Sequence, residues 1–252
     1  MAWTTSTEQG VATLTLDHPP LNILTRAVLA ELTAALRQLA ADPEVRVVRL
    51  VAAGKHFSAG ADVAEHLPPL HEQLIPEFAD AIEALAAFPL PVIAGVRGRC
   101  LGGGFELAQA ADVIVAGEGA TFGQPEILLG VTAPAACVLL PRRSSYGFAA
   151  ELLFTGDAVP AARALAAGLV QAVVPDEQVE EAALALARRC ARHSAVALRE
   201  TKRTLHEAAT RPRGEALRHA ATRYVQDLMR SEDAGAGLRA FVEKRPAAWR
   251  HR

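Results

Sequence analysis

The chain has 252 residues and a formal net charge of −2, from 26 Lys and Arg residues against 28 Asp and Glu residues. This length suits one large domain, or a core with an appendage. The balanced charge gives no field that would favour nucleic acid or an anionic membrane, and aromatic residues, at 5%, are too few to stack many bases.

The cysteines and the N-terminus narrow the class of protein further. Cys100, Cys137 and Cys190 lie far apart, and no CxxC, HExxH or Cys/His cluster is present. We therefore expect neither a disulfide framework nor a metal site. The N-terminus lacks the features of a signal peptide and no apolar stretch is long enough to span a bilayer, so we expect a cytoplasmic protein with no membrane partner.

Strand and helix patterns alternate through the first part of the chain, which predicts βα units in an α/β core. Residues 11–16 alternate apolar side chains with threonine, as in a half-buried strand, and Thr25 is a suitable cap for a helix over 26–40. The elements expected next are a buried strand at 45–51, a loop at 54–62, a helix at 74–88, a strand at 92–96, a turn at 98–104, a helix at 105–111 and a strand at 113–116.

From about Glu177 the pattern becomes helical only, with helices expected at 179–192, 194–209 and 214–229. No repeat or Gly/Ser linker separates the two parts. We therefore divide the chain into a catalytic core at 1–192 and a helical C-terminal region at 193–252, packed on the core or on a neighbouring subunit.

Two glutamates, twenty residues apart, carry the strongest chemical signal. Glu106 follows the triple glycine Gly102-Gly103-Gly104, and Glu126 lies in the segment GQPE. A carboxylate pair can divide proton transfer between a base and an acid. Glycines that open a helix leave backbone N–H groups free to bind a developing oxyanion. The two devices together predict acid–base chemistry on a carbonyl compound.

Three segments, HFSAGADV (56–63), PVIAGVRGRCLGGGFELA (91–108) and TFGQPEILLG (121–130), occur in an order and spacing that closely resemble the enoyl-CoA hydratase (crotonase) family. The resemblance extends through 153–175 and the C-terminal tail. It implies a crotonase (ClpP-like) α/β fold, with a ββα superhelical core and a helical C-terminal trimerisation region. It also implies an acyl-CoA thioester substrate, no cofactor apart from the coenzyme A of that substrate, and a homotrimer or dimer of trimers.

The family resemblance assigns roles to individual residues of this chain. The N–H groups of Ala61 and Gly103 correspond to the family's oxyanion hole. Glu106 corresponds to the base that activates a water molecule and Glu126 to the acid that protonates the enolate carbon, although the two carboxyl groups can also share a proton as a coupled pair. Residues that match the family's substrate and coenzyme A contacts are Asn22, Leu24, Ala59, Asp62, Val63, Ala64, Gly102 and Lys244.

Two segments depart from the common hydratase pattern. Where most hydratases have a glycine-rich segment after GQPEILLG, this chain has VTAPAACVLLPRR (131–143), and the loop after GADV reads AEHLPPLHEQLIPEF. We expect the first change to reshape the acyl pocket beside Glu126. Together the two segments resemble the cyclohexa-1,5-diene-1-carbonyl-CoA hydratase branch of the family, which implies a cyclic dienoyl substrate.

Other functions compete with hydration of an enoyl- or dienoyl-CoA. A double-bond isomerase needs the oxyanion hole but only one carboxylate, so the glutamate pair favours hydration. A non-catalytic scaffold or RNA-binding protein of the same fold is disfavoured by the intact pair and by the near-neutral charge, since RNA-binding proteins usually carry a basic face. Dinucleotide-binding, phosphate-loop and serine-hydrolase functions are disfavoured because GxGxxG, GK[ST] and GxSxG are absent.

Overall fold

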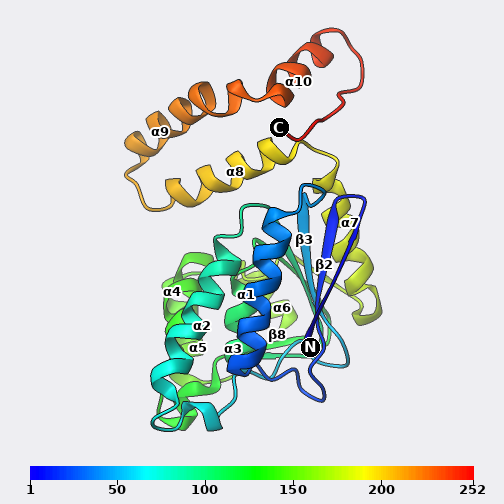
Figure 1. The fold of residues 1–252 in the computed structure, drawn as a ribbon. Helices are drawn as coiled ribbons and strands as arrows, with labels where there is room; N and C mark the ends of the chain where they lie inside the picture. The colour runs from blue at the N-terminus through cyan, green and yellow to red at the C-terminus, as the bar shows by residue number, and fades with distance from the viewer.

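A computed structural model describes all 252 residues as a layered α/β core from which a group of helices projects (Figure 1). The strands are β1 (Trp3–Glu8), β2 (Val11–Leu16), β3 (Val47–Ala52), β4 (Val92–Val96), β5 (Arg99–Leu101), β6 (Val113–Gly117), β7 (Thr121–Gly123), β8 (Val159–Pro160) and β9 (Ala172–Val174). The helices are α1 (Arg26–Ala41), α2 (His71–Ala86), α3 (Gly103–Gln109), α4 (Pro134–Arg143), α5 (Tyr146–Thr155), α6 (Ala161–Ala166), α7 (Val179–Ala191), α8 (Ala195–Ala208), α9 (Arg213–Gln226) and α10 (Glu232–Val242). Short 3-10 helices are η1 (Ala64–His66), η2 (Pro125–Leu129), η3 (Asp176–Gln178) and η4 (Leu228–Arg230).

The strands form two sheets. The larger sheet has the order β1-β2-β3-β4-β6-β9, and only its β1–β2 pair is antiparallel. The smaller sheet has the order β5-β7-β8. The chain passes from β4 in the larger sheet to β5 in the smaller one and then into α3, and β6, β7 and η2 repeat this path. The core is therefore built from ββα units, as expected.

Helices cover both faces of the larger sheet, which explains the apolar character of its strands. All five residues of β4 are buried, as is typical of parallel strands covered on both sides. On one face, β2, β3, β4 and β6 pack against α7 through Ala183, Ala187 and Ala191. The main core, to which α1, α2 and α3 contribute, lies on the other face. Helix α7 is therefore part of the core.

The turn expected at 98–104 is wrong, because this segment contains strand β5 and the start of α3. Residues 99–101 pair in parallel with β7, and Ser58 forms a bridge with Cys100. Such long-range pairing leaves no mark in a glycine-rich sequence. The helix starts at Gly103, before the predicted Phe105, because Gly102 adopts φ 51° and ψ −131° and ends the strand there.

Helix α2 runs from His71 to Ala86, three residues before the predicted start and two before the predicted end. Several elements carry no prediction, among them β1, α4, α5 and α10. Strand β1 buries only Trp3, so its sequence lacks a buried periodicity. Helix α4 contains Pro134 and Pro141, but Pro134 lies in the first turn, where a missing N–H is tolerated.

Helices α8, α9 and α10 lie beyond the core, at the top of Figure 1. A buried ion pair joins them to it, since Lys202 Nζ in α8 lies 2.7 Å from Asp112 Oδ2 and donates to the carbonyl of Leu90 at 3.2 Å. Asp112 lies between α3 and β6, and its Oδ2 also accepts from the Val92 N–H at 2.7 Å. No helix combines the length and apolar character needed to cross a membrane.

Candidate active site

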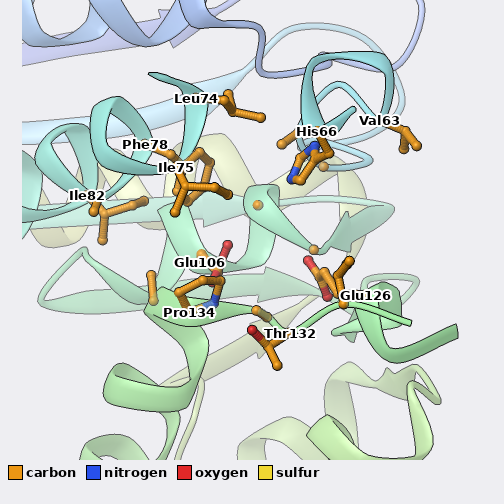
Figure 2. Close-up of a pocket in the computed structure, with 18 of the residues that line it drawn as sticks. Val63, His66, Leu74, Ile75, Phe78, Ile82, Glu106, Glu126, Thr132 and Pro134 are labelled. Atoms are coloured by element: carbon orange, nitrogen blue, oxygen red, sulfur yellow. The ribbon is translucent and has the colours of Figure 1, made fainter. Parts of the chain in front are cut away.

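A cavity of about 570 Å³ lies between α2, α3 and the start of α4 (Figure 2). One end is lined by Val63 and His66 and the other by Ile82, with Glu106 between them. Most of the lining is apolar, including Leu74, Ile75, Phe78, Pro134, Val138 and Leu139. The cavity therefore suits an apolar group that is presented to a few polar atoms.

Two backbone segments meet at the wall of this cavity, residues 59–61 and the turn into α3. The bridge between Leu24 and Ala61 holds the first segment, with Leu24 N–H donating to Gly60 O at 2.9 Å and Asp62 N–H to Leu24 O at 3.2 Å. The second segment is held by Gly102 N–H, which donates to Gly123 O at 2.9 Å. Each segment is thus fixed by its neighbours in the fold.

The N–H groups of Ala61 and Gly103 are left without partners by this arrangement. Neither amide donates to any backbone or side-chain acceptor outside the regular elements, and Gly103, as the first residue of α3, has no partner within its helix. Both residues line the cavity. Two unpaired N–H donors on one cavity wall form a site for an oxygen atom that gains negative charge.

The glycines permit this close approach of two backbone segments. A Cβ atom on Gly103 would lie 2.9 Å from the Phe78 ring and 3.1 Å from the Ala61 amide nitrogen. A Cβ atom on Gly104 would lie 2.5 Å from Ser58 Cβ. Any side chain at these positions would therefore separate the segments or cover the free donors.

Glu106 is almost completely buried, with 3% of its surface exposed, and its carboxyl group faces the cavity. Its Oε1 accepts a hydrogen bond of 2.8 Å from the Ala136 N–H at the start of α4. Burial raises the pKa of Glu106 to about 7, and the charge of Glu126 adds to the rise, whereas the N–H groups of Ala136 and Ala135 oppose it. The group can therefore gain and lose a proton near neutral pH.

Glu126 lies on η2 and is only partly buried. Figure 2 shows its carboxyl group on the same cavity as that of Glu106. Burial raises its pKa, and its own backbone N–H and the charge of His66 oppose the rise. A Cβ atom on Gly102 would lie 2.6 Å from Glu126 Oε1, so the glycine at this position makes room for the carboxyl group. The cavity thus holds two carboxyl groups in different settings.

The structure separates the predicted site residues into two groups. Those that line the cavity are Ala59, Ala61, Val63, Gly102, Gly103, Glu106 and Glu126. Asn22, Leu24, Asp62, Ala64 and Lys244 do not line it. Lys244 follows α10, in the group of helices at the top of Figure 1, away from the α2 and α4 walls of the cavity. Contact of this second group with coenzyme A stays a prediction.

Two of these outlying residues hold the loops that form the site. The buried side chain of Asn22 donates to the carbonyls of Ala53 and His56, both at 2.9 Å, and accepts from the His18 N–H at 2.8 Å. Asp62 Oδ1 accepts from the Ala64 N–H at 2.7 Å, at the start of η1. These contacts give both side chains a structural role beside the cavity.

Some residues at the site carry no prediction from the sequence. His66 lines the cavity, with its Nδ1 2.8 Å from the carbonyl oxygen of Asp62. Gln109 and Gln124 are buried beside the glutamates, each 1% exposed. A glutamine in the apolar run 105–111 was the available signal for Gln109, because a buried amide requires partners. His66 had no comparable signal, since its position depends on the course of the loop.

Residues 131–143 form the wall opposite α2, where the departure from the hydratase pattern was expected to matter. Val131, Thr132, Ala133, Pro134 and Ala135 line the cavity, and Val138 and Leu139 follow on α4. The segment thus provides both the N–H donor to Glu106 and a large part of the apolar surface. The segment lies next to the carboxyl pair, and its effect on the acyl pocket relative to other hydratases stays a prediction.

Known proteins of one family are similar to this chain in both sequence and structure. The sequence profile of the enoyl-CoA hydratase/isomerase family matches residues 6–252. A cyclohexa-1,5-dienecarbonyl-CoA hydratase of Thauera aromatica is 38% identical over 240 residues, 95% of this chain and 92% of the relative. A 2,3-dehydroadipyl-CoA hydratase of Escherichia coli is 35% identical over 243 residues, 95% of each chain. The crystal structure of an enoyl-CoA hydratase from Bacillus anthracis superposes with a TM-score of 0.95 at 31% identity over 100% of both chains.

Proposed function

This chain belongs to the enoyl-CoA hydratase/isomerase family, and we propose that Glu106 and Glu126 together add water to the C=C bond of an acyl-CoA thioester bound in the cavity. The TM-score of 0.95 confirms the expected crotonase fold. With hydratases as its relatives along almost the full length, the chain is an acyl-CoA hydratase. The roles of individual residues and the identity of the acyl group are our own assignments.

The two free N–H groups provide the electrophilic half of the proposed mechanism. The thioester oxygen accepts hydrogen bonds from Ala61 and Gly103, and these bonds strengthen as the oxygen becomes an enolate. Removing one such donor costs on the order of 3 kcal/mol of transition-state stabilisation. The thioester supplies the electron sink for the reaction, so the protein has only to move protons and position water.

The carboxyl pair provides the proton transfers. We assign Glu106 as the base that removes a proton from the attacking water, whose oxygen bonds to Cβ, and Glu126 as the acid that delivers a proton to Cα. The observation that carries this assignment is that both carboxyl groups face one cavity beside two unpaired N–H donors. Because the pKa of Glu106 is about 7, the base is available only once it has lost its proton. Hydration should slow as the pH falls below about 7.

The charges of the lining point to an uncharged acyl group. The residues that line the cavity include four acidic ones, Asp80, Glu83, Glu106 and Glu126, and no Lys or Arg. Apart from His66, the lining offers no cation to an acyl chain that ends in a carboxylate, and the acidic residues would repel such a chain. We therefore propose that the chain does not share the 2,3-dehydroadipyl-CoA substrate of its Escherichia coli relative.

A cyclic dienoyl group is the acyl group that we favour. The relative from Thauera aromatica is a cyclohexa-1,5-dienecarbonyl-CoA hydratase, and a ring of this kind is apolar and uncharged. Ile75, Phe78, Pro134 and Val138 provide an apolar lining on both sides of the cavity. The lining and the relative together support this choice of substrate.

The test compares three thioesters, crotonyl-CoA, cyclohexa-1,5-diene-1-carbonyl-CoA and 2,3-dehydroadipyl-CoA. The loss of enoyl absorbance measures the turnover of each. We expect the highest kcat/KM with the cyclic dienoyl-CoA and the lowest with the carboxylated one. Rapid turnover of crotonyl-CoA alone would contradict the cyclic substrate. Loss of either glutamate separates hydration from isomerisation, because hydration needs both carboxyl groups whereas a proton shuttle needs one.

We also propose that the C-terminal region joins copies of the chain into a trimer or a dimer of trimers. Apolar side chains on its helices are exposed in the single chain, including Leu217 at 66%, Phe241 at 85% and Val242 at 79%. Several large apolar side chains exposed on one region are typical of a protein interface. Light scattering coupled to size-exclusion chromatography would give the mass of the assembly, and a monomer would contradict the proposal. A cytoplasmic location stays a prediction.

A further inference from the structure

A chain of amide side chains runs from α3 to Glu126 through the interior. With its amide nitrogen facing Glu126, Gln124 donates to Oε2 at 3.1 Å and to Oε1 at 3.3 Å. Its carbonyl oxygen accepts from Gln109 Nε2 at 3.2 Å. Both glutamines are 1% exposed, so bulk water does not compete for these hydrogen bonds.

Glu126 and Gln109 together determine which way the Gln124 amide points. In the opposite orientation, the Gln124 oxygen would face the carboxylate oxygens and its nitrogen would face the Gln109 nitrogen. Both contacts would then be repulsive. The donor on Gln109 therefore reinforces the orientation in which the Gln124 amide nitrogen donates to Glu126.

The interior around Gln109 offers little else to an amide. Gln109 ends the buried helix α3, in which Phe105, Leu107 and Ala108 are apolar. Its own Oε1 is buried and has no hydrogen-bond partner. An apolar side chain of similar length would avoid this unpaired acceptor. The unpaired Oε1 of Gln109 therefore lowers the stability of the fold locally, and the one hydrogen bond of this amide is its bond to Gln124.

We propose that Gln109 is a positioning residue that, through Gln124, fixes the orientation of the Glu126 carboxyl group and stabilises the carboxylate that remains once Glu126 has delivered its proton. This inference rests on the proposed catalytic role of Glu126. Two donors from one planar amide hold the plane of the carboxyl group and stabilise its negative charge. Helix α3 then positions both carboxyl groups, since it carries Glu106 and orients Glu126 through its last residue, Gln109.

Three other titratable groups share the surroundings of Glu126. His66 approaches from η1, and its charge lowers the pKa of Glu126. Glu106 faces the same cavity from α3. Cys137 is on α4, and its pKa is raised by burial first and then by the charges of both glutamates. None of these groups is a hydrogen-bond partner of Gln109, so a change at Gln109 reaches them only through the charge of Glu126.

The experiment measures kcat and KM against pH for Gln109→Met, Gln124→Met and the double variant, with the best thioester of the panel. For Gln109→Met we expect the limb of the profile that belongs to Glu126 to move to higher pH by about one unit, with a smaller change in the limb of Glu106 and with kcat affected more than KM. Gln124→Met should show the larger shift. Adding Gln109→Met to it should change nothing further, because the two residues act in series.

Gln171→Met is the matched control. Gln171 also makes side-chain hydrogen bonds, to the Ile114 N–H at 2.8 Å and the Gly168 carbonyl at 3.0 Å, but it is not part of the cavity. We expect the wild-type pH profile. A change in thermal stability without movement of either limb in Gln109→Met would overturn the inference, as would additive shifts in the double variant.

A second measurement does not depend on turnover. In protein with ¹³C-labelled glutamate carboxyl groups, the signal lost in Glu126→Gln identifies Glu126. Its pKa should rise in Gln109→Met, or in Gln109→Leu if the first variant fails to fold. An unchanged titration in a folded variant would overturn the positioning role. Inactivity of the wild-type enzyme on every thioester would instead count against the proposed function alone.

Discussion

The two sides of the cavity hold their carboxyl groups by different means. On the α3 side, Glu106 is almost completely buried and its charge is balanced only by backbone N–H groups at the start of α4. On the η2 side, Glu126 is partly exposed and is held by the amide of Gln124. Burial dominates the first setting, and side-chain hydrogen bonds the second. One fold can therefore give two identical side chains different proton affinities within a single cavity.

This difference explains why the sequence places the acids but does not reveal how they are held. Glu106 and Glu126 are each visible beside glycines or a proline. Their distinct settings come from residues that are far away in the chain, such as Ala136 and Gln109. Because each side can be altered separately, single substitutions can test the contrast between the two settings.

The largest effect is expected from removing either carboxyl group. Glu106→Gln and Glu126→Gln should each lower kcat for hydration by roughly 10²–10⁴-fold, the usual contribution of a general acid or base. Steady-state kinetics with the preferred thioester measures this loss. Glu72→Gln, an exposed change in the first turn of α2 that is not part of the cavity, serves as control. Full activity in either active-site variant would contradict the paired mechanism.

Gly103→Ala should act on the oxyanion donors and leave both acids in place. The new Cβ would lie 3.1 Å from the Ala61 nitrogen and 2.9 Å from the Phe78 ring. We expect kcat to fall by roughly 10²–10³-fold, as when one donor is lost. Gly147→Ala in α5 is the matched control, because nothing lies within 4 Å of its added Cβ. A Gly103→Ala enzyme as active as the control would rule out this wall as the oxyanion hole.

The buried setting of Glu106 should also be visible in stability. Its pKa rises from an ordinary 4.5 to about 7 on folding, so the folded state binds more protons than the unfolded state between these values. The resulting loss of stability begins above pH 4.5 and is complete above pH 7. We expect the stability of Glu106→Gln relative to wild type to increase by about 3 kcal/mol between pH 4 and pH 8.

Urea unfolding of both proteins at a series of pH values measures this difference. Glu126→Gln, whose parent carboxyl group is less buried, should show a smaller increase. An equal pH dependence for the two variants would contradict the contrast between their settings.

The smallest effect is expected from the backbone donor to Glu106. Ala136→Pro removes the N–H that lies 2.8 Å from Glu106 Oε1, and this N–H has no partner within the first turn of α4. The pKa of Glu106 should rise further, so that the acidic limb of kcat/KM moves to higher pH by about one unit. Ala136→Gly keeps the donor and should leave the limb in place. A shift in the limb of Glu126 instead would contradict the assignment of the Ala136 N–H as a donor to Glu106.

The sequence predicted the elements whose patterns are local. Alternation at 11–16 and helical spacing at 26–40 correspond to β2 and α1, because burial there follows from the nearest residues in the chain. Strand β5 was not predicted, since it is stabilised by pairing with β7 and by a bridge to Ser58. The difference arises because β2 and α1 follow from local sequence patterns, whereas β5 depends on contacts with residues far away in the sequence.

The site follows the same rule. Glu106, Glu126, Ala61 and Gly103 are marked by motifs, and the structure brings all four to one cavity. Gln109 appears in the sequence as one polar residue on a buried helix, without any sign of its partner Gln124. His66 reaches the cavity only because the loop before α2 folds over it. Side chains that act through others therefore require coordinates.

The first turn of α4 has a consequence for how such enzymes diverge. Glu106 is held there by a main-chain N–H, which every residue except proline provides. Mutations that exchange the side chains of Thr132, Val138 or Leu139 can therefore remodel the acyl-binding wall while Glu106 keeps the Ala136 N–H as its hydrogen-bond partner. Mutation and selection within this one segment can therefore change the range of substrates while the chemistry of water addition is retained.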